Sequence, residues 1–177
     1  MTRVAYAVDG WGEGELWLDE TRLVWHELPR PPTHPHPGGV HTRLPLRSTI
    51  PARGARGGDP GVPDVRRLVH RLWAYFAGER VSFADVELDL DDWSPFQLDV
   101  ARALRGVGYG ELMSYSDLAR AAGHPNAQRA AGSFCARNRY PLVLPCHRIV
   151  AADGVGSYGS LGIHYKRRLL ALEGVAV

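Results

Sequence analysis

Short runs of apolar and aromatic residues occupy the first 28 positions of the chain, with Gly and acidic residues between them. The runs at 4–8, 16–18 and 23–25 have the length of strands, and the residues between them suit tight turns. This pattern predicts two or three antiparallel strands. Residues 81–90 (VSFADVELDL) alternate apolar and polar side chains, which predicts one further strand.

Apolar residues recur at helical spacing between positions 65 and 76. They are Val65, Leu68, Val69, Leu72, Trp73 and Phe76. Asp64 is placed to cap this helix and Gly78 to end it. The first half of the chain therefore predicts an α+β domain over residues 1–90, with a small antiparallel sheet and a helix.

Residues 29–63 contain 9 of the 13 prolines and 6 of the 20 glycines. This composition predicts a long irregular loop or a disordered insertion. His34, His36 and His41 lie in the segment without acidic or thiol residues next to them, which is weak evidence for a metal site. We therefore assign no metal ligands.

Helix start and stop signals dominate the second half of the chain, residues 91–177. Ser94-Pro95 supplies a capping hydroxyl and a first-turn proline, and the apolar face that follows ends at Gly106. A short helix capped at Ser114 or Ser116 comes next. These signals predict a second, mostly helical domain.

A further helix is predicted over about 126–136, after a turn that contains Gly123. Two short helices joined by such a turn are typical of a helix–turn–helix. The second helix carries mainly small side chains, and Arg129 is its one long basic residue. A small-residue face lets a helix approach a nucleic acid closely, but tight packing inside the protein would have the same pattern.

Charge is distributed unevenly along the 177 residues, whose net charge is +2. Residues 94–177 hold 10 Lys and Arg against 5 Asp and Glu, whereas residues 1–93 hold 11 against 14. A basic C-terminal half indicates an anionic partner, although a solvated charged face has the same composition. The chain has neither a run of about 18 apolar residues nor a signal-peptide pattern, so we expect a cytoplasmic protein without a membrane span.

The chain has two cysteines, Cys135 and Cys146, too few for a disulfide framework or a four-thiolate zinc site. Cys146 follows an apolar run and precedes His147, and Glu173 lies near the C-terminus. A thiol near a histidine that a carboxylate orients is the general arrangement of an activated sulfur nucleophile. A cysteine in an apolar run is also a common core residue, so these residues alone leave both interpretations open.

The segment Pro145-Cys146-His147-Arg148-Ile149-Val150 resembles the Pro-Cys-His-Arg-Val/Ile-Val signature of the methylated-DNA–protein-cysteine methyltransferases, also called O6-alkylguanine-DNA alkyltransferases. The resemblance covers roughly residues 94–174, in family order and near family spacing. The other matching positions are Phe96-Gln97, Gly110-Glu111, Ser114-Tyr115, Arg129-Ala130-Ala131-Gly132, Asn138, Gly156-Ser157-Tyr158-Gly159, Lys166-Arg167 and Leu169-Leu170-Ala171-Leu172-Glu173-Gly174. The N-terminal half fits only as a pattern of strands and a helix.

This resemblance implies DNA repair by direct, irreversible and stoichiometric alkyl transfer. Cys146 would accept the alkyl group from the exocyclic oxygen of guanine, and His147 would deprotonate the thiol through a water. Glu173 would orient the imidazole, and Asn138 would hold the backbone between the helix–turn–helix and the active site. No cofactor is implied, because the electrophile is already on the DNA.

The implied partner is double-stranded DNA that contains an alkylated guanine. The helix over 126–136 would enter the minor groove, and the damaged nucleotide would be flipped out of the duplex. Arg129 would occupy the place of the flipped base, and Tyr115 would press on the backbone phosphate. Further contacts to DNA are expected from Gln128, Ala130, Gly132 and Ser133.

The implied guanine pocket has side-chain and backbone walls. Its expected lining consists of Pro141, Ile149, Tyr158, Gly159 and Ser160, with backbone groups near Cys146 and Ile149 reading the base edge. Cys135 is a further candidate, although a packed small residue is an alternative role. In fold, the resemblance implies a ribonuclease-H-like N-terminal domain and a winged-helix-like C-terminal domain, in a monomer.

The sequence departs from the family pattern at Ala101, Gly108 and Ala131, and in the loop 158–166 (YGSLGIHYK). These departures bear on substrate range. Three other functions compete: a lesion sensor that transfers nothing, a helix–turn–helix regulator and a cysteine hydrolase. The sensor lacks the acceptor Cys, the regulator needs several long polar side chains on its recognition helix, and the hydrolase does not explain Tyr115 or Arg129.

Overall fold

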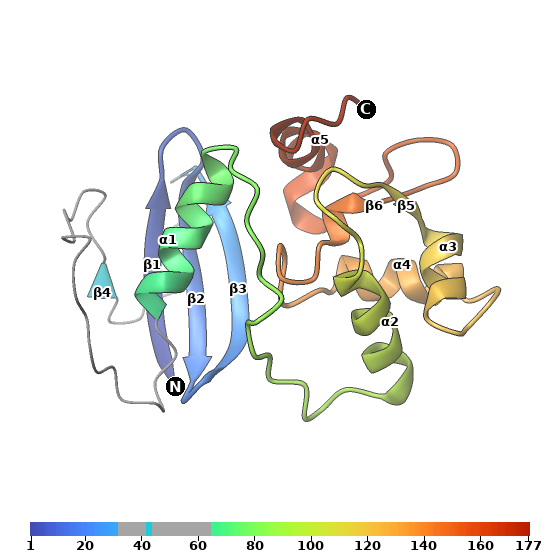
Figure 1. Ribbon diagram of the computed structural model, residues 1–177, viewed down its shortest axis with the longest axis horizontal. Coiled ribbons are helices and arrows are strands. Elements are labelled where there is room, and N and C mark those ends of the chain that lie inside the picture. The colour runs from blue at the N-terminus through green and yellow to red at the C-terminus, as the bar shows by residue number, and fades with distance from the viewer. Residues whose placement is uncertain (32–41, 44–64) are drawn as a thin grey trace. The chain divides into compact units, whose positions relative to one another are not determined.

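The computed structural model describes residues 1–31, 42–43 and 65–177 (Figure 1). The chain forms two compact units. The first comprises Met1–Val81 with Asp85–Asp89, and the second comprises Ser82–Ala84 with Leu90–Val177.

Three consecutive strands of the first unit form an antiparallel meander, as predicted. They are β1 (Thr2–Val8), β2 (Gly12–Asp19) and β3 (Arg22–Arg30), joined by short turns. A fourth strand, β4 (Thr42–Arg43), pairs with β1 in parallel and gives the order β3-β2-β1-β4. β4 lies inside the segment predicted to be irregular, and its parallel pairing makes the sheet mixed.

Helix α1 (Val65–Phe76) lies along one face of this sheet (Figure 1), and its buried side chains are apolar. Leu72 is buried, Phe76 contacts the ring of Trp11 with centroids 4.9 Å apart, and the Nε1 of Trp73 donates to the carbonyl of Ala7 in β1 at 2.9 Å. The helix ends as predicted at Gly78, whose φ of 89° is costly for other residues. The proposed cap Asp64 and the three histidines of the Pro-rich segment lie outside the described residues.

The prediction of a strand over 81–90 was wrong. This segment has turns and one isolated bridge, in which Leu88 pairs with Leu23 of β3. The alternation was a real burial signal, because Phe83, Val86 and Leu88 are buried. A strand needs a ladder of backbone partners as well, and within the described residues this segment forms a single β-bridge, at which Leu23 donates to Glu87 and accepts from Asp89.

The second unit is mostly helical, as expected. Its helices are α2 (Pro95–Arg105), α3 (Tyr115–Ala121), α4 (Gln128–Ala136) and α5 (Gly162–Leu172), with 3-10 turns η1 (Cys146–Arg148) and η2 (Gly159–Leu161). Strands β5 (Met113–Ser114) and β6 (Ile149–Val150) pair in parallel. The core has fully buried side chains from all four helices and from β6: Val100, Leu104, Leu118, Ala119, Ala131, Ile149, Leu169 and Leu170.

Helix starts in this unit follow the local signals closely. Ser94 caps α2 through a capping box with Gln97, and Ser114 caps α3 by accepting from the amide of Asp117. The second helix of the helix–turn–helix begins at Gln128 and not at the predicted Asn126. Asn126 has φ of 72°, a left-handed conformation that a right-handed helix excludes.

Candidate functional site

Cys146 is the first residue of the 3-10 turn η1, directly after Pro145. Its side chain is 4% exposed, and every residue from 140 to 149 is buried. The amide of Cys146 donates to the carbonyl of Leu144 at 2.7 Å. Adjacent side chains point to opposite faces of a strand, but in this turn those of Cys146 and His147 need not.

Asn138 connects the end of α4 to the thiol. Its Nδ2 donates to the Sγ of Cys146 at 3.1 Å and to the carbonyl of Leu144 at 2.8 Å. Its Oδ1 accepts from the amide of Tyr140 at 2.9 Å. One amide side chain therefore holds the buried loop and the sulfur in a single arrangement.

Opposing electrostatic effects act on the pKa of the Cys146 thiol. Burial raises the pKa of Cys146, while hydrogen bonds from Asn138 and the hydroxyl of Tyr158, together with the positive charge of Lys166, lower it. Burial is the largest of these effects. The resting sulfur is therefore a neutral thiol, and a nucleophilic thiolate requires a base.

His147 and Glu173 form a fully buried pair, although they are 26 residues apart in the chain. The Nε2 of His147 lies 2.7 Å from the Oε1 of Glu173. Burial lowers the pKa of His147, and Glu173 opposes this effect by stabilising the imidazolium. The imidazole is thus neutral near neutral pH, and with Nε2 bonded to Glu173 its Nδ1 is the atom that takes up a proton.

Arg148 is a component of this site that the sequence-based assignment of site residues missed. Its Nε donates to the Oε2 of Glu173 and its Nη2 to the Oε1, both at 3.0 Å, and its Nη1 donates to the carbonyl of Val107 at 2.6 Å. The amide of Gly110 donates to the same carboxylate at 2.9 Å. The available signal was the position of Arg148 beside His147 in the signature segment.

Lys166, on α5, is the second missed component and the only lysine in the chain. Its side chain is buried, and its Nζ donates to the carbonyl of Ile149 and, at 3.4 Å, to that of Ser157. The Nζ also lies 5.8 Å from the ring centre of Tyr115. Burial lowers the pKa of Lys166. The ammonium therefore joins β6 to the loop before η2 and places positive charge near both cysteines.

The expected pocket residues lie at different depths. Pro141 and Ile149 are buried, Tyr158 is partly exposed with its hydroxyl at the thiol, and Gly159 and Ser160 are exposed at the start of η2. Cys135, on the inner side of α4, is partly buried, and burial and the nearby Cys146 raise its pKa. The structure thus brings Tyr158 and Ile149 close to the sulfur and its turn, and leaves Gly159 and Ser160 exposed.

Four of the residues expected to contact DNA are exposed on the second helix of the helix–turn–helix. Gln128, Arg129, Ala130 and Ser133 are exposed on α4, while Ala131 and Phe134 of the same helix face the core.

Tyr115, at the start of α3, packs beside this helix. A Cβ at Gly132 would meet its ring at 3.8 Å, and a Cβ at Gly156 would meet it at 3.4 Å. Burial raises the pKa of Tyr115 to about 12, so its phenol stays a neutral donor.

In the described residues, no group of three or more His, Cys, Asp or Glu side chains is placed to hold a metal ion. Over the same ranges, no helix is long and apolar enough to cross a membrane.

The sequence of this chain is similar to those of known proteins. Residues 95–175 match the family described as the DNA-binding domain of 6-O-methylguanine DNA methyltransferase. The methylated-DNA–protein-cysteine methyltransferase of Methanopyrus kandleri is 39% identical over 136 residues, which cover 76% of this chain and 95% of the relative. That of Mycolicibacterium paratuberculosis is 47% identical over 106 residues, which cover 59% of this chain and 62% of the relative, slightly less than two thirds of its length.

Among solved structures, that of Mycobacterium tuberculosis OGT in complex with DNA is similar, with a TM-score of 0.70 and 33% identity over 97% of this chain and 91% of that chain. The fold and site define a protein whose second unit combines a buried thiol, a histidine–glutamate pair and a helix–turn–helix. On the identity and coverage given above, the chain belongs to the methylated-DNA–protein-cysteine methyltransferase family.

Proposed function

We propose that this protein repairs DNA by transferring an alkyl group from the exocyclic oxygen of alkylated guanine to Cys146, once per molecule. The observation that carries the proposal is the buried, neutral thiol held by Asn138 beside a neutral His147 that Glu173 orients. Family membership supports the same reaction.

The alkyl transfer needs no cofactor. The Sγ proton of Cys146 passes through a water to the Nδ1 of His147, and the sulfur attacks the alkyl carbon. The S–C bond forms as the C–O bond breaks, and guanine leaves with the C–O electron pair and takes up a proton. The thioether is chemically inert, so the thiol is not regenerated.

DNA recognition follows from the outer face of α4. Its small residues Ala130, Gly132 and Ser133 allow close approach to the minor groove, and Gln128 adds a polar contact. Because a buried thiol cannot reach a stacked base, the nucleotide must be extruded. Arg129 fills the vacated position, and Tyr115 presses on the phosphate of the rotated nucleotide.

The extruded guanine enters a pocket beside the thiol. Pro141, Ile149 and Tyr158 form its walls, Gly159 and Ser160 form its rim, and Cys135 contributes from α4. We further propose that residues 1–90 form a ribonuclease-H-like domain and residues 91–177 a winged-helix-like domain. We place the protein in the cytoplasm as a monomer.

Intact mass spectrometry tests the proposal. The native protein and Cys146→Ala are each mixed with duplex DNA that carries one methylated guanine. A gain of one methyl group on the native protein alone, mapped to Cys146, is the expected result. No gain with a retained preference for damaged DNA in a gel shift would support the lesion sensor instead, and no gain without that preference would refute both.

A further inference from the structure

Helix α4 has two flanks that differ in their surroundings. Residues advance about 100° per position around a helix, so Gly132 lies on the side of α4 that meets Tyr115. Ala130, Ser133 and Arg137 recur at spacings of three and four residues and lie on the opposite flank. Since the outer face of α4 separates the two flanks, a duplex bound to that face has one flank on each side.

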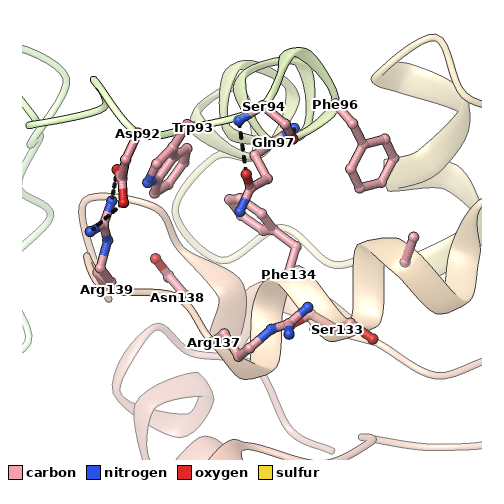
Figure 2. Close-up of a pocket in the computed structure, with 11 residues that line it drawn as sticks. Asp92, Trp93, Ser94, Phe96, Gln97, Ser133, Phe134, Arg137, Asn138 and Arg139 are labelled. Atoms are coloured by element: carbon pink, nitrogen blue, oxygen red, sulfur yellow. Dashed lines mark hydrogen bonds and ion pairs between the residues drawn. The ribbon is translucent and has the colours of Figure 1, made fainter.

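The flank away from Tyr115 lines a groove of about 630 Å³ inside the second unit. The opposite wall is the segment 92–97, which contains the start of α2. Figure 2 shows this arrangement, with Phe134 between the two walls, Arg137 at the end of α4, and Arg139 beside Asp92 and Trp93. The rings of Trp93 and Phe134 meet edge to face, with centroids 5.3 Å apart.

The charges of the groove favour an anion. Arg139 is paired with Asp92, at 2.6 Å and 3.3 Å, and its guanidinium lies 5.5 Å from the ring centre of Trp93. Arg137 is exposed at the end of α4, where its Nε donates to the carbonyl of Ser133 at 3.3 Å. The lining thus has two cations against one carboxylate, and the positive end of the α2 dipole adds to them.

We infer that this groove binds the sugar–phosphate backbone of the DNA strand opposite the damaged base, with Arg137 contacting a phosphate. The inference rests on the proposed function, because it requires α4 in the minor groove with the damaged strand on the Tyr115 side. A helix in the minor groove has one backbone on each flank, so the second backbone passes the groove. Trp93 and Phe134 offer apolar surface to its sugars, and the groove and the outer face of α4 share Ala130 and Ser133.

The first test compares Arg137→Gln with Arg102→Gln as the matched control. Arg102 is an exposed arginine of the same unit that pairs with Asp99 on α2 and does not line the groove. Affinity is measured at several salt concentrations for a methylated duplex and for the damaged strand alone. Removing one phosphate contact lowers the slope of log affinity against log salt by about one. We expect Arg137→Gln to lose duplex affinity several-fold and to keep the affinity of the native protein for the single strand.

The second test replaces single phosphates of the undamaged strand by neutral methylphosphonates. The native protein should lose affinity at one or two adjacent positions, and Arg137→Gln should lose no more at those positions. Three outcomes would overturn the inference. Arg137→Gln could lose as much affinity for the single strand as for the duplex. The losses of affinity from Arg137→Gln and from a methylphosphonate could add, or only methylphosphonates in the damaged strand could lower affinity. Methyl transfer from the damaged single strand to Cys146 is measured in parallel. If the native protein does not transfer, the proposed function fails, whereas transfer without the duplex effect overturns the groove alone.

Discussion

Arg148 holds the carboxylate of Glu173 with two hydrogen bonds of 3.0 Å, and one of the two oxygens also bonds the imidazole of His147 at 2.7 Å. The partner of the general base is therefore shared with a buried cation. Glu173 raises the pKa of His147, and Arg148 lowers it. The basicity of His147 thus depends on a three-residue network and not on the histidine–glutamate pair alone.

Removing the charge of Arg148 should shift the acid limb of the transfer rate. In Arg148→Met the pKa of His147 rises, so the limb moves to higher pH, whereas Arg148→Lys keeps a cation and should leave the limb near that of the native protein. Breaking a buried pair from one side costs about 3–5 kcal/mol of stability. The stability of each variant to urea is therefore measured together with its single-turnover transfer rate. A limb that moves equally in both variants would contradict the electrostatic role.

The acid limb of the transfer rate of the native protein should lie at lower pH than the pKa of a free histidine. Burial lowers the pKa of His147 below its ordinary 6.5, so the neutral base persists as the pH falls through that value. Burial also raises the pKa of Cys146 above its ordinary 9.0, so spontaneous thiolate formation does not contribute near neutral pH. We expect single-turnover transfer to be flat through pH 6.5 and to decline only below it, while fluorescence confirms that the fold persists.

Glu173→Gln separates the charge of the carboxylate from its shape. Loss of the negative charge lowers the pKa of His147 further and weakens it as a base, and general-base catalysis contributes roughly 10²- to 10⁴-fold to rates. Transfer should slow by about that factor. DNA binding, measured by fluorescence anisotropy, should stay within about 2-fold because Glu173 is buried away from the outer face of α4. A variant that loses binding and transfer together would indicate unfolding of the unit.

Asn138→Ala and Asn138→Asp should both slow transfer, for different reasons. Alanine removes the donor to the Sγ of Cys146 and leaves the buried amide of Tyr140 without its side-chain acceptor, at a cost of about 1–3 kcal/mol. Aspartate keeps that acceptor and places a negative charge at the sulfur, which raises the pKa of the thiol. Its second oxygen also faces the buried carbonyl of Leu144, which loses its donor, so aspartate should lower the stability to urea as well. An unchanged transfer rate in Asn138→Asp would contradict the role of this donor.

Two glycines beside Tyr115 offer a matched pair of substitutions. Gly156 has φ of 75°, and a Cβ there would lie 3.3 Å from the amide nitrogen of Ala151 and 3.4 Å from the ring of Tyr115, so Gly156→Ala should destabilise by about 1–2 kcal/mol. Gly132 is helical with ordinary contacts, so Gly132→Ala should raise stability by up to about 1 kcal/mol. The same Gly132→Ala should weaken DNA binding, because the added methyl group would lie beside Tyr115, at the edge of the face that α4 turns to the duplex in the proposed function. Thermal unfolding and gel shifts measure both effects.

Local signals predicted much of this protein. Ser94 and Ser114 begin their helices where capping chemistry places them, and Gly78 ends α1, because each depends on backbone groups within a few residues. The segment around Cys146 was recognisable for a similar reason, since its thiol and histidine are adjacent in sequence. The sequence also placed Asn138 and Glu173 in the site, through the spacing of the family pattern.

Tertiary structure decided what depends on distant partners. Residues 81–90 have the alternation of a strand, yet within the described residues they form one isolated β-bridge, to Leu23. Arg148 reaches Glu173 across 25 residues, and Lys166 reaches Ile149 across 17. The groove joins positions 92–97 to 130–139. Periodicity and capping record only neighbours along the chain, so the sequence alone determined the helices and the candidate nucleophile Cys146. Packing decided which charges surround that thiol and which surface lies beside α4.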